Sequence, residues 1–221
     1  TQFNNASDLT HYPRTPDADI KLLEEAGCDI LYMPEVKDVY PENDTRKFDF
    51  GYLDTILEGA KRPDHFNGVG QVVSILLEGV KPHKAFFGSK DYQQVMVVKN
   101  LVKQLNLEVE IIACPILREA DGLAMSSRNV RLNEQERLEA AAIPEMMKLG
   151  NQILKLYGIA EAKKYINSVV ATIPNMKLEY YEVCDAETLE LLSEFNPKQK
   201  AVSLIAVFVG NIRLIDNWTV N

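Results

Sequence analysis

The strongest constraint on the fold is a regular alternation of helical periodicity and short apolar runs between residues 65 and 117. Apolar residues recur at i, i+3, i+4 and i+7 over residues 69–80, as in an amphipathic helix. The runs KAFFG (84–88) and VEIIACPIL (109–117) have strand length, and the segment between them, 90–105, has helical spacing. Helices that alternate with short strands favour a doubly wound α/β fold with a parallel sheet, where ligands bind at the carboxyl ends of the strands.

The flanking segments extend this pattern on both sides. TPDADIKLLEEAG (15–27) predicts a helix and DILYMP (29–34) a short buried strand. After Leu117 a polar loop leads to Asn133 and Glu136, whose spacing predicts a capping box and a long helix towards residue 157. A second helix (159–172), a strand (177–185), a short helix and two final strands complete a smaller α/β domain. We therefore expect two domains, residues 1–115 and 116–221.

Charge and cysteine content exclude several classes of protein. The net charge is −8, from 24 basic and 32 acidic residues, which argues against a nucleic-acid partner. No apolar run approaches the ~20 residues of a membrane span. The three cysteines are far apart and lack the spacing of a disulfide framework or zinc site, so we interpret them as small buried hydrophobes in a cytoplasmic protein.

The segment GSKDYQQ (88–94) is the first candidate for chemistry. It begins like a helix with Ser89 as the cap, yet Lys90 places a cation at the positive end of the helix dipole. Helical phase puts Gln94 on the same side as the apolar stripe and Gln93 on the opposite side. An anion near the helix start would neutralise Lys90. An ordinary cap with a solvated lysine fits this segment alone equally well.

The segment AMSSRN (124–129) is the second candidate. Two adjacent serines and an arginine offer hydroxyls, backbone amides and a planar guanidinium, which suit a polyphosphate and the charge that develops on leaving pyrophosphate. A polar interdomain linker is the alternative. Two such loops, each following a predicted strand, support a nucleotide site more strongly than either loop does alone.

Two further positions carry weaker signals. In RPDHFNGVG (62–70), Arg62 and His65 flank a turn before the strong helix, and His65 suits acid–base or substrate contact. An ordinary histidine in a surface loop explains the same pattern. Gln2, in TQFN, has no functional signature of its own.

Taken together, these strings closely resemble the pantoate–β-alanine ligase (pantothenate synthetase) family. The resemblance runs through TQFN, YPRTPDAD, VYP, LEGAKRPDHFNGV, FFGSKDYQQ, READGLAMSSRN and RLIDN, in the family's order and over essentially the whole chain. It implies a Rossmann-like nucleotidyltransferase domain followed by a smaller carboxyl-terminal lid. It also implies a cytoplasmic homodimer.

The reaction implied by the resemblance has two steps. ATP and (R)-pantoate give pantoyl adenylate and pyrophosphate, and the amine of β-alanine then displaces AMP to give pantothenate, with Mg²⁺ accompanying ATP. The alternative is a non-catalytic nucleotide-binding fragment of the same superfamily. A synthetase-like fragment that binds RNA is a third reading, which the acidic charge argues against.

Site roles follow from the matched motifs. Lys90, Ser126, Ser127 and Arg128 are implied to hold the phosphates and to be catalytic. The other implied ATP contacts are Gly88, Ser89, Asp91, Leu117 (through its backbone) and Met125. Gln94 and Gln2 are implied to bind pantoate, and Gln2 also β-alanine. Arg62 and His65 are implied to line the site, and no protein metal ligand is implied. Where Ser89 stands, the family usually has Glu.

One part of the family pattern does not occur in the sequence. The family carries an upstream PTMGALHxGH segment, whose histidines contact the ATP phosphates, and this chain contains nothing like it. A Rossmann-like sheet without that segment would expose an apolar face and strand edges. We therefore expect the native protein to have a further amino-terminal segment with this motif.

Overall fold

The computed structural model describes residues 9–10, 12–42 and 44–220. Two compact units make up the chain. One consists of Thr1–Ala85 with Val97–Glu110, and the other of Phe86–Met96 with Ile111–Asn221. The fold is of the expected α/β class, with a parallel pair of strands and a separate antiparallel sheet.

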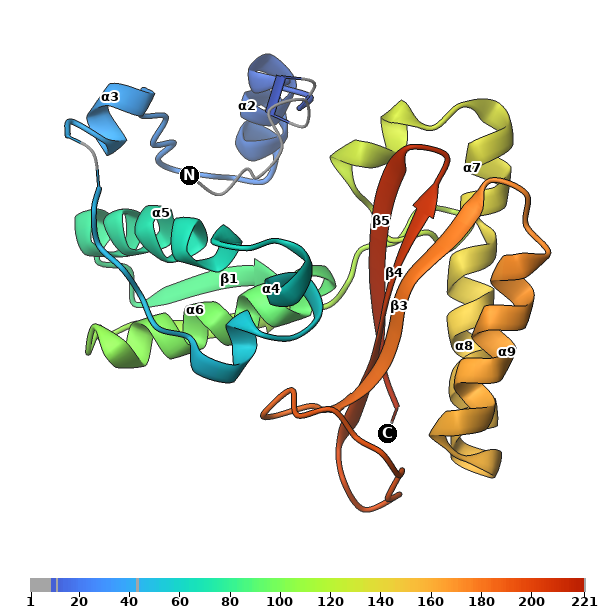
Figure 1. The fold of residues 1–221 in the computed structure, drawn as a ribbon. Coiled ribbons are helices and arrows are strands. Elements are labelled where there is room, and N and C mark those ends of the chain that lie inside the picture. Colours follow the sequence, from blue (N-terminus) through green and yellow to red (C-terminus); the bar gives the residue numbers. More distant parts are fainter. Residues whose placement is uncertain (1–8, 11, 43, 221) are drawn as a thin grey trace. The chain divides into compact units, whose positions relative to one another are not determined.

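The predicted strand–helix–strand unit is present. Strands β1 (Lys84–Gly88) and β2 (Glu110–Cys114) pair with each other, and helix α6 (Tyr92–Gln104) connects them (Figure 1). The predicted helices before it are α2 (Pro16–Glu25), which has Pro16 in its first turn, and α5 (His65–Val80). Shorter helical segments complete this part of the chain: α3 (Val36–Val39), η1 (Gly51–Asp54) and α4 (Leu57–Lys61).

Residues 29–34 do not form the predicted strand. They have no regular secondary structure, and Ile30 is 86% exposed. A strand needs a neighbouring strand to satisfy its backbone groups, and within the described residues the parallel sheet consists of β1 and β2 only. The interpretation of Cys28 as buried is wrong for the same reason, because this cysteine precedes the irregular segment and is exposed.

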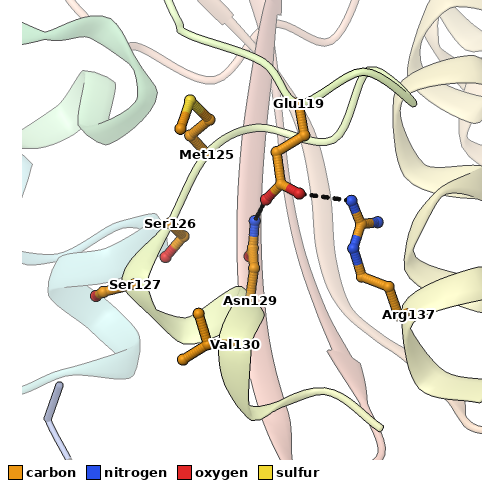
Figure 2. Close-up of a pocket in the computed structure, with 7 residues that line it drawn as sticks. All are labelled: Glu119, Met125, Ser126, Ser127, Asn129, Val130 and Arg137. Carbon is orange, nitrogen blue, oxygen red and sulfur yellow. Dashed lines mark hydrogen bonds and ion pairs between the residues drawn. The ribbon is translucent and has the colours of Figure 1, made fainter. Parts of the chain in front are cut away.

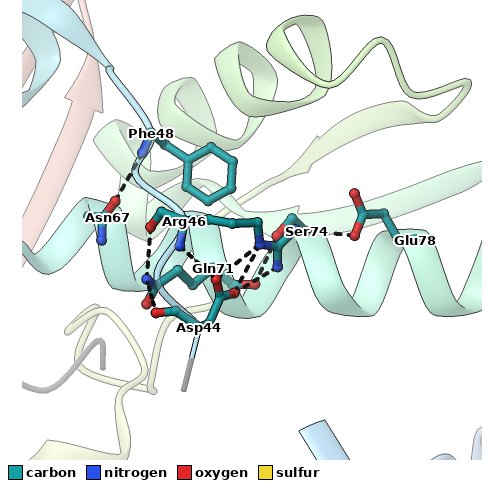
Figure 3. Close-up of polar contacts among 7 residues, drawn as sticks. All are labelled: Asp44, Arg46, Phe48, Asn67, Gln71, Ser74 and Glu78. Atoms are coloured by element: carbon teal, nitrogen blue, oxygen red, sulfur yellow. Dashed lines mark hydrogen bonds and ion pairs between the residues drawn. The ribbon is translucent and has the colours of Figure 1, made fainter. Parts of the chain in front are cut away.

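The segment from Asp44 to Phe48 is fixed along α5 by side-chain contacts (Figure 3). The Gln71 amide donates to the carbonyl oxygens of Asp44 and Arg46, at 2.9 Å each. Hydrogen bonds from the Arg46 guanidinium hold the pKa of Asp44 below its usual value. A Cβ atom on Gly70 would lie 2.7 Å from the Phe48 ring. Glycine at this position therefore allows the extended segment to approach the helix.

The second unit contains the antiparallel sheet. Strands β3 (Met176–Asp185), β4 (Ala201–Val209) and β5 (Ile212–Thr219) pair in the order β3-β4-β5. Helices α8 (Ala142–Tyr157) and α9 (Ile159–Ala171) lie side by side along this sheet (Figure 1). Their apolar faces and the sheet form one core, which includes Met147, Ile166 and Ile205. This arrangement leaves β5 as an edge strand.

The long helix predicted from Asn133 is divided in two. The Asn133–Glu136 capping box is present at the start of α7 (Glu134–Ala140), and α8 begins at Ala142. The cause is Pro144, which has no N–H to donate to the Ala140 carbonyl and whose ring crowds that oxygen. The predicted capping box is confirmed, and the prediction of one continuous helix towards residue 157 is wrong.

The short helix predicted after β3 is also absent. Residues 186–188 form a turn, because the Asp185 carboxylate accepts the backbone amides of Glu187 and Thr188 at 2.8 and 2.9 Å. Such an Asx-type turn satisfies the amides that would begin a helix.

The cysteines allow a direct test of these burial assignments. Burial raises the pKa of Cys184 to about 12, and the nearby Glu182 carboxylate adds to this effect. A buried thiol with that pKa carries on the order of 10³-fold fewer reactive thiolates than an ordinary cysteine. We expect a thiol reagent such as DTNB to modify Cys28 rapidly and Cys184 only after unfolding. Stopped-flow absorbance measures both phases. Cys28→Ser should remove the Cys28 contribution and leave only that of the partly exposed Cys114 in the folded protein, and rapid modification of Cys184 there would contradict the core assignment.

Candidate nucleotide-binding site

The GSKD motif forms a tight turn at the end of β1. The chain passes from Gly88 into the 3-10 turn η2 (Ser89–Asp91), and α6 begins directly after it. Gly88 occupies the cap position of this turn and Ser89 lies inside it, so the prediction of Ser89 as the helix cap is wrong. The Lys90 side chain is 16% exposed, and its Nζ atom lies 4.0 Å from Asp91 Oδ2.

The structure changes the interpretation of the two glutamines of α6. Gln93 is 2% exposed, so the prediction that it points away from the core is wrong. Val97, one helical turn later, is completely buried, and residues four positions apart share a helix face. The buried arc of α6 is therefore wider than the predicted stripe and includes Gln93. Gln94 is half-buried, beside Gln93 in the first turn of α6.

The READGLAM segment folds back on itself. An antiparallel bridge joins Arg118 and Ala124, and the Met125 amide donates to the Leu117 carbonyl at 2.9 Å. The turn is made by Asp121, whose carboxylate accepts the Leu123 amide at 3.1 Å, and by Gly122, at φ +89°. This bend brings Leu117 and Met125, two of the expected ATP contacts, next to each other, and the side chains of both are exposed.

The serines and the arginine of AMSSRN begin the short helix η3 (Ser127–Arg131). Ser126 is its cap, and the Ser126 hydroxyl oxygen accepts the Arg128 amide at 3.2 Å. An open pocket of about 620 Å³ adjoins this turn (Figure 2). Its lining residues are Glu119, Met125, Ser126, Ser127, Asn129, Val130 and Arg137. Three of the expected ATP-binding residues therefore line one pocket.

The wall of this pocket is held by a polar network that the sequence reasoning missed. Asn129 is buried and donates to the Glu119 carboxylate and to the Ala124 carbonyl oxygen. Arg137 donates to the second oxygen of Glu119 at 2.7 Å, as Figure 2 shows. Arg137 also pairs with Asp121 and so lowers the pKa of that carboxyl. Glu119, Asn129 and Arg137 thus fix the loop that carries Ser126 and Ser127.

Both candidate loops lie against the same edge strand. β5 is in contact with η2 and with η3, and all three elements belong to the second unit. At the level of single residues, the Asn217 amide donates to the carbonyl oxygens of Ser89 and Lys90, at 2.8 and 2.9 Å. The GSKD turn and the AMSSRN loop therefore contact the same strand, β5.

Arg62 and His65 belong to the first unit. Arg62 follows α4 and lies 3.8 Å from the buried Glu58 carboxylate. His65 opens α5, is 6% exposed and packs against Phe66, with 5.1 Å between the ring centroids. The explanation of His65 as an exposed loop histidine is therefore wrong. Gln2, the expected pantoate and β-alanine contact, lies outside the described residues.

Two features are absent from the described residues. No group of three or more His, Cys, Asp or Glu side chains there is arranged to hold a metal ion. No helix in the same part of the chain is long and apolar enough to span a membrane.

Comparison with known sequences gives one family. The model of the pantoate-beta-alanine ligase family matches residues 1–219. The pantothenate synthetase of Bacteroides fragilis is 46% identical over 217 residues, which are 98% of this chain and 77% of that protein. That of Cytophaga hutchinsonii is 45% identical over 221 residues, 99% of this chain and 78% of its own length.

Solved structures agree with the sequence matches. The pantothenate synthetase of Thermus thermophilus is 38% identical, with a TM-score of 0.92 over 99% of this chain and 79% of its own. The Francisella tularensis ligase, solved with beta-gamma ATP and beta-alanine, is 34% identical, with a TM-score of 0.78 over 100% of this chain and 76% of its own. With a family match over nearly its whole length and the same fold, the chain belongs to the pantoate–β-alanine ligase family.

Proposed function

We propose that this protein condenses (R)-pantoate with β-alanine in an ATP-dependent reaction that forms pantothenate. A pantoate carboxylate oxygen attacks the α-phosphorus of ATP and pyrophosphate leaves, which gives pantoyl adenylate. The β-alanine nitrogen then attacks the acyl carbon, the bond to AMP breaks and the amine loses a proton. The single observation that carries this proposal is the family match over residues 1–219. The ATP and β-alanine bound by the Francisella tularensis relative support the same substrates here.

The proposed phosphate site consists of residues from both loops. Lys90, Ser126, Ser127 and Arg128 hold the phosphates and neutralise the charge that moves to pyrophosphate in the adenylation step. Charge must be neutralised because both reactants, the pantoate carboxylate and ATP, are anionic. The attacking oxygen, the α-phosphorus and the leaving pyrophosphate oxygen must also be held in line. The contacts of β5 with both η2 and η3 support this grouping, because they place the two loops beside one strand.

The remaining assignments complete the proposed site. Gly88, Ser89, Asp91, Leu117 and Met125 are proposed to contact ATP. Gln94 and Gln2 are proposed to bind pantoate, and Gln2 also to bind β-alanine. Arg62 and His65 are proposed to line the site.

The proposed Mg²⁺ ion arrives with ATP. Mg²⁺ commonly keeps several waters and is bound through substrate phosphates with one or two carboxylates. The ion would neutralise phosphate charge, and its site would depend on bound nucleotide.

The proposed organisation of the protein follows the family. Residues 1–115 act as the nucleotide- and pantoate-binding domain and residues 116–221 as a lid, in a cytoplasmic homodimer. The family match over residues 1–219 does not support the expected further amino-terminal segment.

Exchange of labelled pyrophosphate into ATP tests the proposed function. The ligase reaction predicts exchange that requires pantoate and proceeds without β-alanine. A non-catalytic nucleotide-binding fragment predicts ATP binding without exchange. Absence of pantoate-dependent exchange in the folded full-length protein would contradict the proposal.

Gln94 is expected to bind pantoate and not ATP. Gln94→Ala removes an amide that hydrogen-bonds a carboxylate, so we expect the Kd for pantoate to rise about 10- to 100-fold. The Kd for ATP should change by less than about threefold. Isothermal titration with each ligand measures both. Gln104→Ala, at the other end of the same helix, is the matched control and should alter neither affinity. Equal losses for pantoate and ATP would refute the assignment.

A further inference from the structure

Asn217 holds both peptide groups that flank the Lys90 Cα atom. Its side chain is buried, with the residue 5% exposed on the edge strand β5. The Nδ2 atom donates to the Ser89 oxygen, which belongs to the peptide before Lys90, and to the Lys90 oxygen, which belongs to the peptide after it. Both backbone torsions of Lys90 are therefore constrained by one side chain.

These two hydrogen bonds also determine where the Lys90 amide points. In a planar trans peptide the C=O and the following N–H point in opposite directions. Because the Ser89 carbonyl points at Asn217, the Lys90 N–H points away from β5. Fixed torsions likewise set the direction in which the Lys90 side chain leaves the backbone. One contact thus orients the Lys90 amide and sets the direction of the Lys90 Cα–Cβ bond.

The neighbouring residue on β5 holds the second loop. The carboxylate of Asp216 accepts two hydrogen bonds from Arg118, at 2.8 and 3.0 Å, and one from the backbone N–H of Asn217, at 2.8 Å. Arg118 in turn donates to the Gly122 carbonyl and lies over the Trp218 ring, 5.0 Å from its centroid. Asp216 therefore anchors the READGLAM turn and Asn217 anchors the GSKD turn, at adjacent positions on β5.

We infer that Asn217 is a positioning residue for adenylation, which acts through Lys90 by fixing its backbone. This inference rests on the proposed function, because the reaction assigns Lys90 to the phosphates. The physical reason is that electrostatic stabilisation of a transition state depends on donors held in place before the reaction. Without Asn217, the turn has to be ordered by the substrate, at a cost in rate.

A double-mutant cycle in the full-length protein tests this inference. Asn217→Ala is expected to slow pantoate-dependent exchange about 10²-fold, mostly in kcat, with the KM for pantoate nearly unchanged. In a Lys90→Ala background the same substitution is expected to cost less than about threefold, because the effect passes through Lys90. Asn167→Ala, an exposed asparagine on α9 that bonds only within its own helix as far as described, is the control and should leave exchange unchanged.

A second variant separates positioning from packing. Asn217→Asp preserves the shape of the side chain but replaces the donor with carboxylate oxygens, which face the two carbonyl oxygens at neutral pH. We expect it to lose at least as much exchange as Asn217→Ala. The rise in Tm on adding ATP should fall in both variants, and this readout needs no turnover.

Each remaining outcome overturns a stated part of the argument. Near-normal exchange in folded Asn217→Asp overturns the positioning role, as do additive losses in the cycle. Failure of both Asn217 variants to fold also overturns it, because Asn217 would then be structural. Absence of exchange in the wild-type protein overturns the proposed function and this inference with it.

Discussion

Replacing Lys90 with alanine is expected to reduce pantoate-dependent pyrophosphate exchange by about 10²- to 10³-fold, the range seen when one donor to a developing charge is removed. The lysine is largely enclosed, with a side chain that is 16% exposed, and it lies between a strand end and a helix start. Its ion pair with Asp91 is long, at 4.0 Å, and the Asp91 side chain is half exposed. Such a pair contributes little to stability. We therefore expect a large loss of rate and a small change in Tm.

Three variants make this result specific. Lys90→Met retains the apolar stem and removes the charge, and we expect it to lose as much exchange as Lys90→Ala. Lys90→Arg retains the charge with a different geometry and should recover part of the rate. Lys99→Ala, an exposed lysine on α6, the helix that follows η2, is the control. Unchanged exchange in Lys90→Ala, with an unchanged Tm, would remove Lys90 from the proposed phosphate site.

Local patterns in the sequence predicted most of the regular elements. The apolar spacing over residues 69–80 corresponds to α5, the runs KAFFG and VEIIACPIL contain β1 and β2, and the final runs correspond to β3, β4 and β5. These predictions succeed because the spacing of apolar residues within each element indicates its type and its buried face. The motifs GSKD and AMSSRN are predicted to follow strands, and GSKD does follow β1 directly, whereas the contacts of both with β5 of the antiparallel sheet were not predicted.

Two of the wrong predictions depend on information outside the local pattern. DILYMP has strand composition, but no strand within the described residues pairs with it. The position of Gln93 depended on the complete buried arc of α6, which the stripe of Val95, Val98 and Leu101 underestimates. Pro144 was visible in the sequence, and its effect on the helix from Asn133 follows from the missing N–H.

The supporting residues of the candidate site were not predictable from a single sequence. READG and RLIDN belong to the strings that resemble the family, but no local rule pairs Arg118 with Asp216, 98 positions away. Asn217 and Lys90 are 127 positions apart. Contacts at this separation are set by the tertiary fold, so the sequence indicates which residues are present and the structure indicates which of them meet.

The Arg118–Asp216 pair carries the largest expected effect on stability. The Asp216 side chain is completely buried, whereas that of Arg118 is 24% exposed. Arg118→Met leaves a buried carboxylate without its cation, which typically costs about 3–5 kcal/mol of unfolding free energy. For a chain of this size that loss corresponds to a Tm lower by roughly 6–20 °C. Chemical denaturation and differential scanning calorimetry measure the two quantities.

Two comparisons separate loss of the pair from loss of arginine packing over Trp218. Arg213 and Glu179, on the same sheet, form a pair in which both side chains are partly exposed, at 21% and 18%. Arg213→Met is therefore expected to cost only about 1 kcal/mol. The double variant Arg118→Met/Asp216→Leu should regain much of the lost stability, because an apolar pair has no buried charge to satisfy. Equal losses for Arg118→Met and Arg213→Met, with no recovery in the double variant, would mean that the buried charge is not the cause. Recovery of stability without recovery of exchange would show that the Arg118–Asp216 pair serves the geometry of the two loops as well as the fold.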